Sequence, residues 1–231
     1  YLRLTDEQYL LNGPALAAMV ETENSKIGAL RQQLPAWILV VSIAGYGTLA
    51  EDQFNYKKGD LAAEAQAKGI NLAESIGGIS EEHYRQTIIR QVSAEPYWKL
   101  RPKGDCREIF FLTPTSRVGE FIAAIEKKAD TAGVSRGNMG IYVQQVIQGT
   151  ACHLCVDLYV TPEEVDALHR FYTDLSGDIF AMGGYYSRPY GEWSDLVYPP
   201  AETFVKYARK IKGLFDPDNI MNPDKLCFKR M

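Results

Sequence analysis

Residues 107 to 182 contain a fixed succession of strand and helix patterns, and this order limits the possible folds more than any other feature of the chain. A strand pattern over Arg107–Thr113 precedes a helical pattern over Arg117–Ala132, in which apolar residues recur every three or four positions. Gly133 then marks the end of the helix. A second strand pattern follows at Gly140–Gln148.

The rest of this segment reverses direction and adds a second helix. Gly149 and Thr150 allow a tight turn into a strand over Ala151–Val160, which should pair antiparallel with the strand before it. The capping box Thr161–Glu164 has proline at the first helical position and predicts a helix that ends near Gly177. Asp178–Met182 can form a last strand, and the order β-α-β-β-α-β predicts a ferredoxin-like half over residues 106–190.

Residues 1–105 are interpreted as a first, degraded half of the same unit, and residues 191–231 as a C-terminal helix and tail. The expected elements are a helical lead-in over residues 1–34, a strand at Trp37–Ala44, helices at Thr48–Lys68 and Ser80–Val92, and a loop at Pro96–Asp105. The predicted fold class is therefore α+β, with two ferredoxin-like βαββαβ halves, one a duplicate of the other, forming an antiparallel sheet covered by helices.

Charge and hydropathy limit the possible partners. A formal net charge of −4 argues against nucleic acid, because binding phosphates requires a basic face. The longest apolar run, Ala36 to Ala44, is too short to cross a bilayer, and no targeting or lipidation motif is present. We therefore expect a cytoplasmic protein without a membrane partner.

The Cys152-His153-Leu154-Cys155 segment has the C-x-x-C spacing of redox and zinc sites. The segment also alternates like a strand, which directs the two sulfurs to opposite faces. We expect neither a disulfide nor a metal here, with a redox or metal role as the minor alternative.

Residues 216–228 form a double Asp/Asn-Pro turn after an amphipathic helix. The string resembles the closing signature of FAD-linked oxidases of the vanillyl-alcohol oxidase and 4-cresol dehydrogenase type. Asn219 and Asp224 replace two glycines of that signature, and both residue types tolerate the left-handed conformation.

Three further stretches extend the resemblance in the same order: residues 36–47, Ile109–Pro114 and Met139–Glu164. The resemblance implies that residues 1–231 are the cap, or substrate domain, of such an oxidase. Because the chain has no G-x-G-x-x-G motif and no P-loop, we expect the N-terminal FAD-binding domain to be absent from it. FAD would then be held together with that missing domain or subunit.

The segment from Gly183 to Trp193 resembles the cap segment in which a tyrosine and an arginine face the flavin and stabilise a phenolate. The resemblance implies catalytic roles for Tyr186 and Arg188, with Arg188 also contacting the cofactor. An arginine among aromatic residues can pair bidentately with an anion. The alternative is an arginine that bridges loop carbonyls while the aromatic residues form core.

Other site residues follow from the same resemblance. His153 matches a histidine-bearing strand and would be catalytic, with an ordinary hydrogen-bonded strand histidine as the alternative. The substrate would be bound by Tyr142, Tyr185, Tyr190 and Trp193, and Asn222 would contact the cofactor. No metal ligands are expected, because no histidine follows His169, whereas metal-dependent D-lactate dehydrogenases have histidines there.

These features together predict the substrate-binding part of an FAD-dependent oxidoreductase that moves hydride from a small aromatic alcohol or phenol to flavin. The isolated chain would be inactive, and the complete protein would be an oligomer. The alternative is a non-enzymatic, stand-alone cap that acts as a ligand-binding or assembly subunit.

Overall fold

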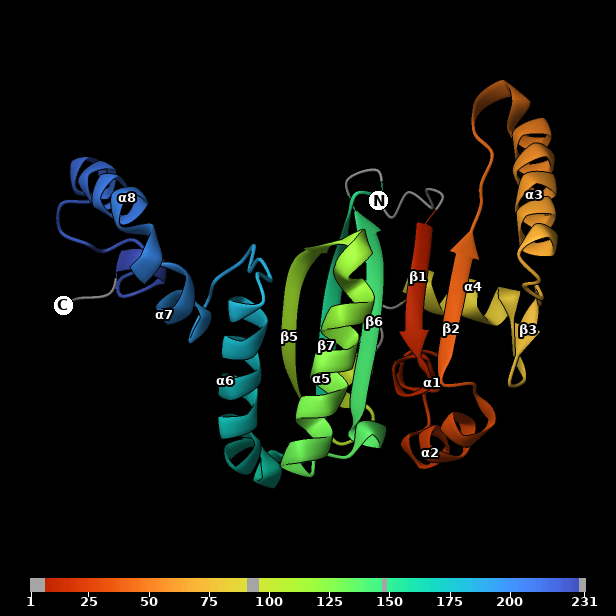
Figure 1. Ribbon diagram of the computed structural model, residues 1–231, viewed down its shortest axis with the longest axis horizontal. Helices are drawn as coiled ribbons and strands as arrows, with labels where there is room; N and C mark the ends of the chain where they lie inside the picture. The colour runs from red at the N-terminus through yellow and green to blue at the C-terminus, as the bar shows by residue number, and fades with distance from the viewer. Residues whose placement is uncertain (1–6, 91–95, 147–148, 229–231) are drawn as a thin grey trace.

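The computed structural model of the protein describes residues 7–90, 96–146 and 149–228. Its centre is a five-stranded sheet in which every neighbouring pair is antiparallel (Figure 1). In spatial order the strands are β2 (Trp37–Ser42), β1 (Glu7–Asn12), β6 (Met139–Val146), β7 (Ala151–Val160) and β5 (Asp105–Pro114). The α+β class with an antiparallel sheet is thus confirmed.

Two helices cover one face of the β5-β7-β6 part of the sheet, α5 (Val118–Ala132) and α6 (Val165–Ala181) (Figure 1). Phe121 and Ile125 of α5 and Leu175 of α6 pack with the buried strand residues Phe111 and Leu154 in one core. Removing this apolar surface from water supplies the main stabilisation of the layer.

The second core lies at the other end of the sheet, around α1 (Gly13–Val20). Leu11 and Leu16, which are almost completely buried, belong to one apolar cluster with Ile38, Trp98 and Tyr159. The remaining elements are smaller or more peripheral: α2 (Asn24–Gln33), α3 (Ala50–Ala67), the hairpin of β3 (Ser75–Ile76) and β4 (Ile79–Ser80), α4 (Glu81–Arg90), α7 (Trp193–Val197) and α8 (Glu202–Phe215).

Short 3-10 helices connect many of these elements. They are η1 (Gly47–Leu49), η3 (Trp98–Leu100), η4 (Thr115–Arg117), η5 (Arg136–Asn138), η6 (Pro162–Glu164), η7 (Pro199–Ala201) and η8 (Leu226–Phe228). No helix among the described residues combines the length and hydrophobicity that a bilayer crossing requires.

Most elements predicted between residues 107 and 177 are confirmed. The β6–β7 hairpin pairs Val146 with Ala151, although residues 147–148 of the predicted strand lie outside the described residues. Gly133 ends α5 in the left-handed conformation at φ 70°, and the Thr161–Glu164 capping box forms. Of the predicted helix Ser80–Val92, α4 covers Glu81–Arg90, Ser80 ends β4, and residues 91–92 lie outside the described residues.

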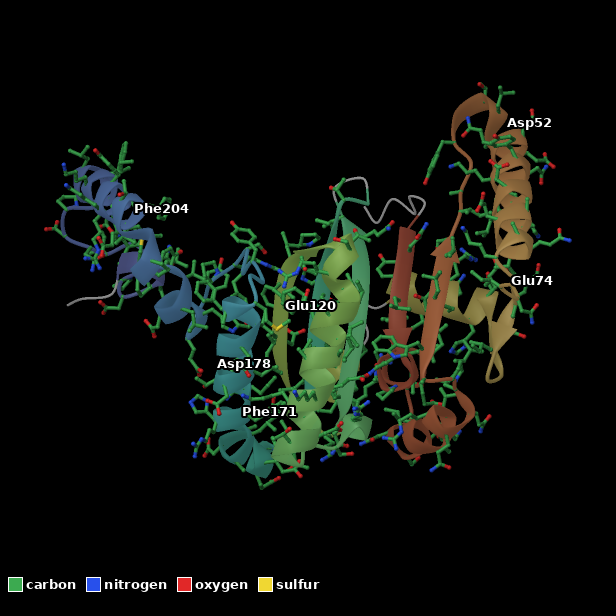
Figure 2. The ribbon with its side chains drawn as sticks, viewed as in Figure 1. Asp52, Glu74, Glu120, Phe171, Asp178 and Phe204 are labelled. Atoms are coloured by element: carbon green, nitrogen blue, oxygen red, sulfur yellow. The ribbon has the colours of Figure 1, made fainter. Side chains whose placement is uncertain are left out.

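The predicted strand at Asp178–Met182 is wrong, because α6 continues through Gly177 to Ala181; Figure 2 labels Asp178 on this helix. Phe171, Leu175 and Ile179 keep four-residue spacing and all face the core, so burial favours continuing the helix. The fourth strand is reduced to one bridge, in which Leu112 and Tyr185 exchange backbone hydrogen bonds of 2.8 and 2.9 Å.

The helical lead-in is wrong at Glu7–Asn12, which forms β1. This strand pairs with β2 on one side and β6 on the other, and Leu11 is fully buried. Tertiary pairing therefore overrides the local pattern. Strand β2 and helix α3 confirm the predicted elements at 37–44 and 48–68, while the duplication of the unit stays a prediction.

Candidate functional site

The side chains of β7 alternate between the two faces of the sheet, as predicted. Leu154 and Val156 join the helix-covered core, whereas His153, Cys155 and Asp157 point to the other side. We call this second surface the open face, defined by Glu108, Phe110, Tyr142, His153, Cys155 and Asp157.

Three rings form the centre of the open face. The His153 ring lies 5.8 Å from the ring of Phe110 on β5 and 5.9 Å from that of Tyr142 on β6. All three side chains are partly exposed. They form an aromatic surface on neighbouring strands, held in place by the antiparallel register.

His153 has an unused polar atom at this surface. Its Nε2 is buried and has no hydrogen-bond partner among the described residues. Burial lowers the pKa of the imidazole, and the positive charges of Arg188 and Lys99 lower it further. A neutral imidazole with a free nitrogen can accept a proton or a hydrogen bond.

Arg188 lies at the edge of the same surface. Its guanidinium carbon is 4.6 Å from the centroid of the Phe110 ring, and the side chain is exposed. No carboxylate forms an ion pair with it in the described part of the chain. The loop is drawn close to α6 by Gly184, where a Cβ atom would come within 2.6 Å of Ile179.

Tyr186 and Trp193 lie behind this surface. Tyr186 is 1% exposed, stacks on Trp193 at 4.7 Å, and donates its hydroxyl hydrogen bond to the Ser176 carbonyl at 2.9 Å. Trp193 donates to Ser176 Oγ and meets the Phe110 ring edge-on at 4.9 Å. The structure therefore does not bring the Tyr186 hydroxyl together with Arg188 and His153.

The remaining predicted residues make no ring contact with Phe110, Tyr142 or His153 among the described residues. Tyr185 and Tyr190 are largely exposed, at 62% and 59%. Asn222 is in the C-terminal turn, in the left-handed conformation at φ 47°. Asn219 and Asp224 also have positive φ, as expected for the residues that replace glycines.

The sequence reading missed a buried lysine. Lys99 lies in η3, within the predicted loop, and its side chain is 4% exposed. Its ammonium donates to Asp157 Oδ1 at 2.8 Å, to Glu108, and to Cys155 Sγ at 3.6 Å. The one feature of the sequence that indicates a buried cation is Asp157, an acid inside an apolar strand, since a buried carboxylate requires a cation.

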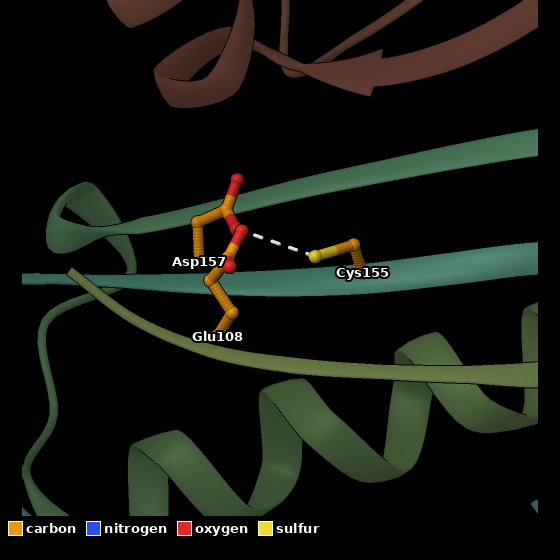
Figure 3. A group of neighbouring side chains, drawn as sticks. All are labelled: Glu108, Cys155 and Asp157. Carbon is orange, nitrogen blue, oxygen red and sulfur yellow. Dashed lines mark hydrogen bonds between the residues drawn. The ribbon is translucent and has the colours of Figure 1, made fainter. Parts of the chain in front are cut away.

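Figure 3 shows the three acceptor side chains, with Cys155 bonded to Asp157 at 3.3 Å. Their ligand atoms lie within 4.8 Å of one another, a spacing that a metal ion could use. The Lys99 ammonium already bonds to all three, so a cation occupies the centre of the group. Burial alone would lower the pKa of Lys99, but the charge of Asp157 raises it overall.

The sequence model of the family described as FAD linked oxidases, C-terminal domain, matches residues 36–226. This match includes every residue of the open face and the loop that carries Arg188. No curated protein matches the chain.

Proposed function

The chain belongs to the family of FAD linked oxidases, C-terminal domain, and from this membership we propose that residues 1–231 form the substrate-binding cap of an oxidoreductase acting on a small aromatic alcohol or phenol. The observation that carries the proposal is an aromatic surface that holds His153 Nε2 and the Arg188 guanidinium, neither of which has a hydrogen-bond or ion-pair partner in the described part of the chain. Polar groups that converge on an apolar surface are typical of ligand sites.

The residues of the open face suit the ring end of FAD better than its phosphates. Phe110, Tyr142 and His153 offer ring surfaces, and the Lys99 charge is occupied by carboxylates. One glycine-containing turn before a helix is Gly45-Tyr46-Gly47, which follows β2 and precedes α3.

This glycine turn is poorly suited to phosphate. Glu51 and Asp52 lie in the first turn of α3, where they stabilise the helix dipole but would repel an anion. The pyrophosphate would therefore be bound by a separate FAD-binding domain or subunit.

The three rings of the open face and the neighbouring Arg188 then each have a defined task. Arg188 pairs with the phenolate or carboxylate oxygen of the substrate, and Phe110 and Tyr142 support its ring. His153 Nε2 accepts the proton of the substrate hydroxyl, which neutral imidazole can do near pH 7. Because this atom is buried, the substrate must displace the side chains that cover it. Bound flavin would supply the hydride acceptor.

Replacing Arg188 by alanine in the protein assembled with its FAD-binding domain tests the proposal. Affinity for 4-hydroxybenzoate should fall about ten- to hundred-fold, because a charge-assisted pair contributes roughly 1.5–3 kcal/mol. Affinity for benzyl alcohol, which has no anionic group, should change much less. The melting temperature should stay nearly constant, since the arginine has no carboxylate partner among residues 7–90, 96–146 and 149–228.

Arg170→Ala is the matched control, because that side chain is 93% exposed on α6. It should leave both affinities unchanged. A lower melting temperature for Arg188→Ala with unchanged affinity would assign Arg188 to the structure of the loop. That outcome favours the second candidate, a non-enzymatic cap that serves as an assembly subunit.

A further inference from the structure

Trp193 is enclosed behind the aromatic surface and is held there by three contacts. The residue is 4% exposed, and its indole Nε1 donates a hydrogen bond of 3.1 Å to Ser176 Oγ on α6. Its ring stacks on Tyr186 at 4.7 Å and on Tyr172 at 6.2 Å between ring centroids. Because the buried N–H has an acceptor in one direction and the ring is stacked, the indole has little freedom to rotate.

Ser176 anchors this arrangement to a helix of the core. It is 1% exposed, and its carbonyl accepts a hydrogen bond of 2.9 Å from the Tyr186 hydroxyl, while its own hydroxyl accepts from Trp193. Two rings of the loop over residues 183–193 are therefore bonded to a single residue of α6. The position of these rings follows the helix and does not depend on the loop alone.

The fixed indole meets the ring that lies beneath Arg188. Trp193 and Phe110 form an edge contact, with centroids 4.9 Å apart and an angle of 90° between the rings. The Arg188 guanidinium carbon in turn lies 4.6 Å over the centroid of Phe110. Since no carboxylate pairs with this guanidinium within residues 7–90, 96–146 and 149–228, its contact with the Phe110 ring is what restrains it.

We propose that Trp193 is a positioning residue of the site, which holds the Phe110 ring in place and thereby keeps the Arg188 guanidinium ready for an aromatic anion. This inference rests on the proposed function, in which Arg188 pairs with the substrate oxygen. An arginine that is ordered before binding loses less conformational entropy when the anion arrives. Trp193 then favours anionic over neutral substrates without touching either.

Removing the Ser176 hydroxyl tests this order of contacts by NMR in the 231-residue protein. An aromatic ring shifts the signals of protons that lie over it, so the Arg188 Nε–H signal reports on its place above Phe110. Ser176→Ala leaves the indole N–H without its acceptor, and the Arg188 signal should move toward its position in Phe110→Leu, where the ring is absent. Trp193→Phe, which removes the N–H and keeps a ring, should move the signal in the same direction.

Ser194→Ala is the matched control. Ser194 is 3% exposed, and its hydroxyl donates to the Gly191 carbonyl in the same loop at 2.6 Å, not to a ring. This variant should leave the Arg188 signal unchanged. A native Arg188 signal in Ser176→Ala or in Trp193→Phe, or an equal movement in the control, would overturn the inference. If one of the two test variants does not fold, the other decides alone.

Ligand binding separates this inference from the proposed function. In the protein assembled with its FAD-binding domain, Ser176→Ala should weaken the binding of 4-hydroxybenzoate about two- to tenfold, because the released arginine must be ordered again. Binding of benzyl alcohol and kcat for its oxidation should change much less. If the Arg188 signal moves and the affinity for 4-hydroxybenzoate does not, the order of contacts holds and the proposed role of Arg188 in substrate binding fails. If the signal does not move, the inference fails whatever the affinity.

Discussion

At the scale of single residues, the contact between Lys99 and Asp157 differs from the surface ion pairs of this protein. Their side chains are 4% and 0% exposed, whereas the members of the Lys26–Glu23 pair are each 59% exposed. Desolvation makes a buried pair weak evidence for net stability. Removing one member is nevertheless costly, because the other charge stays buried without a partner.

Lys99→Met should therefore destabilise the protein by about 3–5 kcal/mol in urea unfolding followed by tryptophan fluorescence. The double variant Lys99→Met with Asp157→Asn should recover most of this loss, since no fully buried charge then lacks a partner and the Glu108 carboxylate is 39% exposed. Lys26→Met, which breaks an exposed pair, should leave stability nearly unchanged. A Lys99→Met variant as stable as the native protein would mean that water reaches Asp157.

The residues that the sequence placed well are those governed by local alternation. His153, Cys155 and Asp157 share one face because they lie two positions apart in a strand, whatever surrounds it. Cys152 lies in the helix-covered core, so the two thiols of the C-x-x-C segment are separated as expected. Lys99 and Tyr186 could not be placed, because each depends on how an irregular loop folds over the sheet.

At the scale of elements, glycine alone did not predict where a helix ends. Gly133 ends α5 in the left-handed conformation, but Gly177 lies within α6 and a Cβ there would meet nothing within 4 Å. The same residue type marks an end in one helix and is tolerated in the interior of another. Burial of Ile179 one half-turn later decides the second case.

Gly177→Ala should stabilise the protein by about 0.5–1 kcal/mol, because alanine loses less backbone entropy in a helix. Gly133→Ala is the matched comparison and should destabilise it by about 1–2 kcal/mol, since alanine is strained in the left-handed region. Thermal melts of both variants measure the difference. Destabilisation by Gly177→Ala would place a helix end near residue 177, as the sequence first suggested.

Helix α8 shows that an amphipathic pattern predicts a helix but not its partner. Phe204, Tyr207, Ile211 and Leu214 form its apolar face, and each is at least 57% exposed. Phe204 is labelled on this helix in Figure 2. Their spacing of three and four residues predicts one apolar face, but nothing in that spacing says what covers it.

At the scale of the whole molecule, the sheet joins two parts of the chain that local patterns treat separately. Strand β1 lies between β2 and β6, so residues 9–11 pair with residues 142–144. Pairing over such a sequence distance leaves no signal in either segment alone. The order β6-β7-β5 follows from local patterns, whereas the contribution of β1 and the bridge at Tyr185 do not.

The open face also predicts how the isolated chain should treat flavins. Its rings and Arg188 can contact a flavin ring, while the glycine turn before α3 has carboxylates at Glu51 and Asp52. FAD and riboflavin share the ring and differ in the phosphates and adenosine. The 231-residue protein should therefore bind both weakly and with similar affinity, as measured by quenching of flavin fluorescence.

A phosphate-binding loop would change this comparison, because each charge-assisted hydrogen bond to the pyrophosphate contributes roughly 1.5–3 kcal/mol, or about ten- to hundred-fold in affinity. Binding of FAD more than about tenfold tighter than riboflavin would thus show that this chain holds the phosphates itself. Glu51→Gln with Asp52→Asn would then locate the site, since removing two anions from the α3 N-terminus should strengthen FAD binding there and leave riboflavin unaffected. With the phosphates bound by a separate domain, the same double variant should change neither affinity.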